Sequence, residues 1–116
     1  MNGMLVEPIE DSLYQAITMN LQIGEDTKRV SLELRYMEKT DLWYMSLYDL
    51  QTDEIYLSYV PLLASYGGKY NNLWKPFSYK EIGFLVCYPK SDSPTTENPS
   101  KDNLSEFEIV WGDGLG

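Results

Sequence analysis

The chain has 116 residues and a mass of 13.4 kDa, which is the length of a single domain. Acidic residues outnumber basic residues by 18 to 9, so the formal net charge is −9 at pH 7. Such a chain repels nucleic-acid phosphates and lacks the long apolar run of a membrane-spanning helix, so we expect neither tight nucleic-acid binding nor a membrane protein. The aromatic content of 14% is too high for a disordered tail. The composition indicates one compact domain that is rich in tyrosine.

The sequence contains no histidine, and this absence limits its chemistry. Histidine is the commonest general base and metal ligand, and it completes the Ser-His-Asp and Cys-His triads. The single cysteine, Cys87, has no cysteine partner in the chain and no histidine to activate it, so we expect it to fill a strand. Asp49, Asp53 and Glu54 fall in one turn but lack the spacing of a calcium loop. We therefore predict no enzyme activity, no catalytic residue, no metal site and no cofactor.

The first predicted elements are an N-terminal arm and a hairpin. Residues 1–15 mix acids, a proline and isolated apolar positions, so we expect an arm or a loosely docked strand there. Apolar and polar residues then alternate over 17–23 and over 30–36, which is the period of a half-buried strand. The polar residues 24–27, which include a glycine, join the two runs. The pattern predicts a β-hairpin.

Two more strands are predicted in the middle of the chain. In the run 42–48, Trp43 shares one face with a methionine and a leucine, and the opposite face carries two tyrosines. The run 54–60 has a β-type composition with both faces largely apolar or aromatic. Pro61 ends this run, because proline cannot donate to a sheet ladder.

The second half of the sequence is less regular. Residues 62–80 carry paired glycines and paired asparagines that interrupt any long element, and 82–88 form a nearly continuous apolar strand. Residues 89–103 form a polar loop with three prolines, longer than most connections, so we expect it to be mobile or functional. A last strand is predicted at 107–111, and residues 112–116 are expected to be a frayed tail.

Short strands separated by turns, with no sustained helical period, predict an all-β fold. We expect a single small antiparallel β-sandwich or barrel of about six to seven strands over residues 16–111. The order of the strands is not set by this pattern.

The aromatic residues are the best lead to a function. Ten tyrosines and three tryptophans are more rings than a core of this size is expected to hold, and tyrosine is enriched where proteins meet. We predict a protein-interaction surface formed with the 89–103 loop. Its candidate residues are Tyr44, Tyr48, Tyr56, Tyr66, Tyr70 and Trp74. Rings that only cap the ends of the fold, or a small carbohydrate- or host-surface-binding module, are the alternatives.

The order and spacing of these segments resemble the small plug proteins of phage tail baseplates, a family known from a contractile-tailed cyanophage and widespread in prophages. The resemblance covers most of the chain. In the first half it is carried by the opening hairpin, the Trp43 strand with Leu47 and Asp49, and the Pro61-Leu62-Leu63 step. In the second half it is carried by the Ile82-Gly83-Phe84-Leu85-Val86 strand, the Asp102-Asn103-Leu104 loop end and a short closing strand.

This resemblance implies a non-enzymatic structural protein, a plug at the axis of a phage baseplate or tail-like particle. Its implied partners are hub, tube or spike proteins, and several copies of the chain in one assembly remain an open alternative. The implied location is the virion baseplate, after synthesis in the host bacterial cytoplasm. The charge of −9 is consistent with this role, because an acidic wall does not hold the phosphates of passing DNA.

Overall fold

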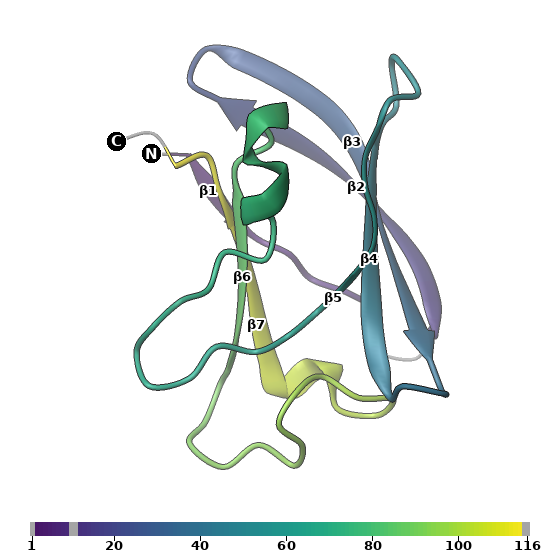
Figure 1. The fold of residues 1–116 in the computed structure, drawn as a ribbon, viewed down its shortest axis with the longest axis vertical. Helices are drawn as coiled ribbons and strands as arrows, with labels where there is room; N and C mark the ends of the chain where they lie inside the picture. The colour runs from purple at the N-terminus through teal and green to yellow at the C-terminus, as the bar shows by residue number, and fades with distance from the viewer. Residues whose placement is uncertain (1, 10–11, 115–116) are drawn as a thin grey trace.

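In a computed structural model, which describes residues 2–9 and 12–114, two antiparallel β-sheets pack face to face (Figure 1). The predicted all-β fold is confirmed, and of the two expected architectures it is the sandwich. One sheet has the order β2-β3-β4-β5, formed by Tyr14–Ile23, Asp26–Met37, Leu42–Asp49 and Ile55–Pro61. The other has the order β1-β7-β6, formed by Gly3–Leu5, Phe107–Gly112 and Phe84–Pro89. Two short 3-10 helices, η1 (Lys75–Lys80) and η2 (Leu104–Glu106), lie in the connections.

The predicted hairpin is the longest paired unit of the fold. Strands β2 and β3 pair without interruption from Tyr14 opposite Arg35 to Ile23 opposite Asp26. The connection is two residues long rather than the expected four, because both strands continue to the turn. Gly24 is its first residue and has φ of 60°, a conformation that glycine adopts without steric cost.

The two ends of the described chain lie side by side (Figure 1). Strand β1 falls within the segment expected to be an arm or a docked strand, and it pairs with β7 from Gly3 opposite Gly112. The N–H of Asp113 donates to the carbonyl oxygen of Asn2 at 2.9 Å. Parts of the predicted arm and tail, residues 1, 10–11 and 115–116, lie outside the described residues.

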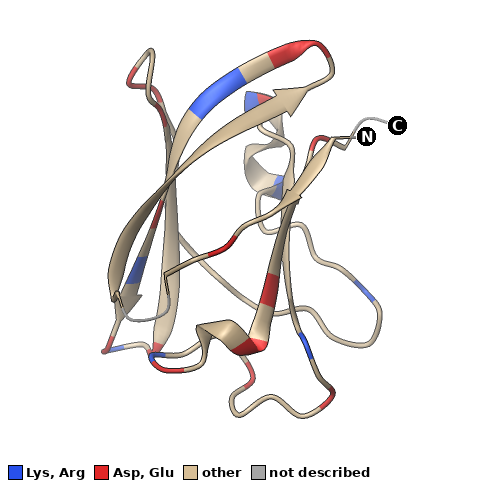
Figure 2. Ribbon diagram, turned by 180° about the vertical axis from the view of Figure 1, so that it is seen from behind, with Lys and Arg blue, Asp and Glu red and all other residues tan. Residues whose placement is uncertain are grey.

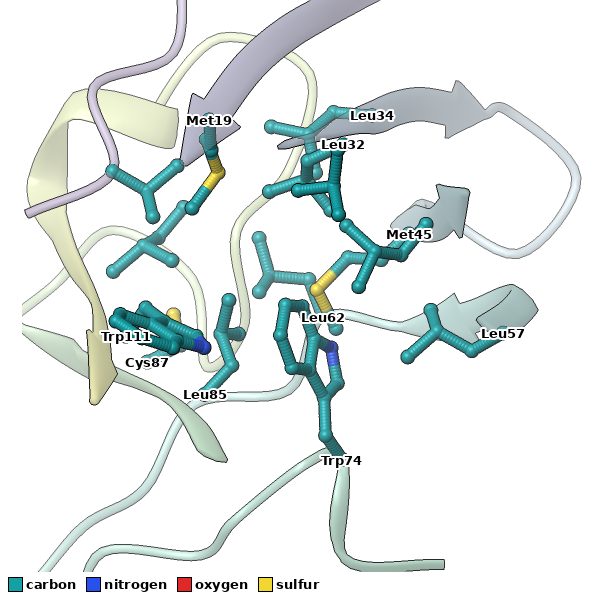
Figure 3. Packing of buried hydrophobic residues seen from close by; sticks show 14 of the residues in the cluster. Met19, Leu32, Leu34, Met45, Leu57, Leu62, Trp74, Leu85, Cys87 and Trp111 are labelled. Carbon is teal, nitrogen blue, oxygen red and sulfur yellow. The ribbon is translucent and has the colours of Figure 1, made fainter. Parts of the chain in front are cut away.

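The core lies between the two sheets and contains all three tryptophans, of which Trp74 and Trp111 are labelled in Figure 3. Trp43 and Trp111 donate their indole N–H groups to the carbonyl oxygens of Ser100 and Ile82, at 2.7 and 2.8 Å. Cys87 is buried here, and burial raises the pKa of its thiol to about 12. Neither helix in the described part of the chain has the length and apolarity to span a membrane.

Candidate interaction surfaces

The structure places the six predicted interface residues in three separate parts of the molecule. Tyr44 and Tyr48 lie on the outer face of β4, where they alternate with buried residues. Tyr66 and Tyr70 lie in the connection between β5 and η1, and both are exposed. The remaining two, Tyr56 and Trp74, are 4% and 0% exposed. Only the first two pairs are therefore available to a partner of the folded chain.

The burial of Tyr56 corrects the expectation that this ring lies on the surface. The register between β4 and β5 shifts between Leu47 and Tyr48, so that Tyr56 is the extra residue of a β-bulge. Both Tyr56 and Leu57 are consequently buried. The Tyr56 hydroxyl donates to a carboxylate oxygen of Asp49 at 2.7 Å, which satisfies its polar end inside the fold.

The burial of Trp74 is a second correction. The side-chain oxygen of Asn72 accepts the N–H of Trp74 at 2.9 Å and the N–H of Leu85 at 3.1 Å, and so fastens this segment to β6. The indole ring therefore packs among Met45, Leu62 and Leu85 (Figure 3). A run of residues without a sequence period gives no sign of which ring points inward.

The outward-facing tyrosines of the four-stranded sheet form the first candidate surface, which we call the tyrosine face (Tyr14, Tyr44 and Tyr48). Tyr14 lies opposite Arg35, which in turn lies opposite Tyr44, so the three side chains form one row across the sheet. The Tyr14 hydroxyl donates to Glu33 at 2.5 Å, and the Arg35 guanidinium lies 4.7 Å from the centre of the Tyr14 ring. The hydrogen bond to Glu33 raises the pKa of Tyr14.

Three exposed residues at this surface were not among the predicted interface residues. Tyr14 fell within the predicted arm, although extending the alternation of 17–23 backwards places it on the outward face. Ile55 lies opposite Tyr48 and is 60% exposed. Tyr59 is 54% exposed and has φ of 52°, and its N–H donates to the hydroxyl of Ser46. Ile55 and Tyr59 do not follow a simple alternating pattern, because the register of β5 is irregular.

A second candidate surface, the loop-end cluster, combines Tyr66, Tyr70 and Tyr88 with residues 89–97. The rings of Tyr70 and Tyr88 meet edge to face with their centres 5.2 Å apart. The Tyr66 hydroxyl donates to the carbonyl oxygen of Glu97. These rings, with Ser91 and other residues of the loop, line a hollow of about 280 Å³. Two predicted tyrosines and the predicted loop are thus brought together.

The 89–103 loop is anchored to the sandwich along its second half. Asn98 accepts the N–H of Ala64 at 2.8 Å, and the carbonyl oxygen of Ser100 accepts the indole N–H of Trp43 at 2.7 Å. The N–H of Thr95 donates to Glu106 at 2.9 Å, and this bond lowers the pKa of the Glu106 carboxyl group. The N–H of Lys90 also donates to the carbonyl oxygen of Glu106, and the exposed residues 91–93 lie between these contacts.

Two other features of the described residues are a hollow beside η1 and the acidic turn after β4. The hollow, of about 530 Å³, lies between the β2–β3 turn and η1, where Lys28 donates to the carbonyl oxygens of Lys80 and Glu81. In the turn, Asp49 accepts the N–H groups of Gln51 and Thr52. Across residues 2–9 and 12–114, no group of three His, Cys, Asp or Glu side chains is placed to hold a metal ion.

Comparison with known proteins gives the chain a family. The model of the family described as cyanophage baseplate Pam3 plug gp18 matches residues 4–114, which include most of β1 and all of the other strands. Comparison with curated proteins gave no match. The resemblance to baseplate plug proteins is confirmed, and the chain belongs to the cyanophage baseplate Pam3 plug gp18 family.

Proposed function

We propose that this chain is a non-enzymatic plug at the axis of a phage baseplate, where it contacts hub or tube proteins through its surface tyrosines. As a member of a baseplate plug family, it is a structural baseplate component that associates with other baseplate components. The family match, which spans both sheets of the sandwich, is the observation that carries the proposal.

The tyrosine face suits a protein partner. Its rings are large and apolar with a polar tip, which is the combination that is enriched at protein interfaces. Tyr14 is already held in place by Glu33 and Arg35, so little side-chain entropy remains to be lost when a partner covers it. The adjacent Ile55 extends the apolar area of this surface.

The negative charge of the chain supports a position at the tail axis, where DNA passes and is not bound. Figure 2 shows that many acidic residues lie at the turns and ends of the sandwich, where they give the molecule an acidic outline. With a net charge of −9, this outline repels phosphates. A plug at the tail axis needs such a surface, since DNA has to pass without being held.

The test is co-elution of the purified chain with purified hub and tube proteins of the same phage in size-exclusion chromatography. We expect co-elution for the natural chain, and at least about tenfold weaker binding when Tyr44 and Tyr48 are both replaced by alanine, since central interface tyrosines contribute strongly. The matched control is Tyr79→Ala, which removes an exposed tyrosine on η1, outside the four-stranded sheet that carries the tyrosine face.

Two results would contradict parts of this proposal. If the variant with alanine at both Tyr44 and Tyr48 co-elutes as well as the natural chain, the tyrosine face is not the interface. The loop-end cluster is then the candidate that is left. Binding of the isolated chain to a glycan array, without co-elution with any tail protein, would favour the carbohydrate-binding alternative instead.

A further inference from the structure

The four edge strands of the two sheets differ in how well they are protected from pairing with another strand. Unprotected edges present free N–H and C=O groups, and proteins usually shorten, bend, charge or cover them. Strand β1 has three residues, and β5 has an irregular register and ends at Pro61. The edge of β6 is covered, because its residues Leu85 and Cys87 accept hydrogen bonds from the N–H groups of Leu73 and Ser65.

Strand β2 has none of these protections. It is ten residues long, pairs with β3 in an unbroken register, and contains no charged residue, proline or glycine. Figure 2 shows β2 on the near side of the molecule, without a coloured charge anywhere along its length. In a chain with 23% charged residues, this edge is the natural place for a further strand.

The hydrogen bonds around β2 identify which backbone groups face outward. The N–H of Tyr36 donates to the carbonyl oxygen of Leu13, so the odd-numbered residues of β2 face β3 and the even-numbered ones face away. At the two ends, the outward carbonyl oxygens of Tyr14 and Gln22 accept hydrogen bonds from the side chains of Ser12 and Asn2.

The middle of the edge is open. Ala16, Thr18 and Asn20 are exposed, and no hydrogen bond within the described residues uses their outward N–H and C=O groups. These groups alternate along the strand in the pattern that an antiparallel neighbour requires.

We propose that β2 pairs antiparallel with β2 of a second copy of the chain, about a two-fold axis at Thr18. Ala16 then lies opposite the partner's Asn20, Thr18 opposite the partner's Thr18, and Asn20 opposite the partner's Ala16. All three pairs join residues whose backbone groups face outward, so each pair forms two hydrogen bonds. The two four-stranded sheets become one continuous sheet. This pairing goes beyond the proposed function and does not depend on it.

The side chains along this axis favour a second copy in particular. The opposed side chains are small and neutral, and a Thr–Thr pair is favourable across antiparallel strands. Ala16 lies opposite Glu33 and Asn20 lies opposite Arg29 within the hairpin. Each row of the joined sheet therefore carries Glu33 of one copy and Arg29 of the other. Opposite charges share a row, although each whole chain carries −9.

The test is sedimentation equilibrium of the full chain from about 10 μM to about 1 mM in physiological salt, a range that resolves a moderate or weak dimer. We expect a mass that rises toward twice 13.4 kDa. Thr18→Pro removes one outward N–H without touching the β3 ladder, and we expect it to weaken the dimer at least about tenfold. Thr18→Val, the matched control, keeps that N–H and stays dimeric. A natural chain that remains monomeric, or a Thr18→Pro variant that still forms the dimer, would overturn the proposal.

Amide hydrogen exchange of the natural chain gives a readout that does not depend on folding of a variant. We expect the amides of Ala16, Thr18 and Asn20 to become protected as the concentration rises, while those of β5 stay unchanged. Equal exchange of the three amides at both ends of the concentration range would also overturn the proposal.

Discussion

At the scale of single residues, the three tryptophans are buried to the same degree but differ in their polar contacts. The indole N–H of Trp43 and that of Trp111 each donate to a backbone carbonyl. The indole nitrogen of Trp74 is buried without a hydrogen-bond partner among the described residues. A buried N–H without a partner costs about 1 to 3 kcal/mol. Trp74 thus stabilises the fold through the packing of its ring alone.

Replacing each tryptophan by phenylalanine tests this difference. All three changes leave a similar gap, but those at Trp43 and Trp111 also leave a carbonyl oxygen without its donor. We therefore expect Trp74→Phe to destabilise the fold by at least about 1 kcal/mol less than either of the other changes. Urea unfolding with an unchanged m-value measures the free energies. Equal losses at all three positions would show that the indole N–H groups do not set the difference.

At the scale of elements, the turn between β4 and β5 is organised by one carboxylate. Asp49 is 5% exposed and accepts hydrogen bonds from the Tyr56 hydroxyl and from the N–H groups of Gln51 and Thr52. The bond from Tyr56, followed by those from the backbone, holds the pKa of Asp49 below its ordinary value despite the opposing effect of burial. The ionised carboxylate therefore closes the turn and fixes the bulge.

This turn predicts a dependence of stability on pH. Because the pKa of Asp49 is lowered by folding, its contribution is present above the unfolded value of about 3.9 and is lost as the pH falls through the folded value. We expect Asp49→Asn to cost about 1 to 3 kcal/mol at pH 7 and to flatten the loss of stability below about pH 4. Urea midpoints measured between pH 7 and the acid limit give both quantities.

Tyr56→Phe is the matched control for the acid titration, since it removes the largest cause of the lowered pKa and keeps the ring. It should flatten the acid loss partly, while Asp41 and Glu106, whose pKa values are also lowered by hydrogen bonds, maintain the rest. An acid profile of Asp49→Asn identical to that of the natural chain would contradict this account of the turn.

Local sequence patterns predicted the strands better than they predicted which side chains are buried and which distant strands pair. The alternation over 17–23 and 30–36 identified the hairpin, because one face of each strand is buried. At Tyr56 there was no alternation to use, because both faces of the run 54–60 are largely apolar or aromatic, and a single extra residue in a bulge turns Tyr56 inward. The same was true at Trp74, where no period exists to extend. The pairing of β1 with β7 joins opposite ends of the chain, and no local signal specifies it.

At the scale of the whole molecule, the acidic surface predicts that the protein does not retain DNA. In buffer of about 0.15 M salt we expect no binding of duplex DNA tighter than the weak end of non-specific affinities, about 10⁻⁴ M. Fluorescence anisotropy with a labelled duplex measures this, and repeating it in lower salt is the control, because any basic patch would then bind more tightly. Saturable binding at either salt concentration would contradict the proposed role of the charge.

The hydrogen bond between Asn2 and Asp113 holds the two ends of the described chain together, so a protein fused to either end would be attached at the same place. Asn2 also contacts Gln22, and Gly24 donates to the carboxylate of Asp113, so both termini of the described chain lie beside the β2–β3 turn. A fluorescent tag or linker fused at either end would leave from this one pole of the sandwich. Tyr70 packs against Tyr88 near the far end of β6, so a tag at the termini would leave the candidate surface around these rings uncovered.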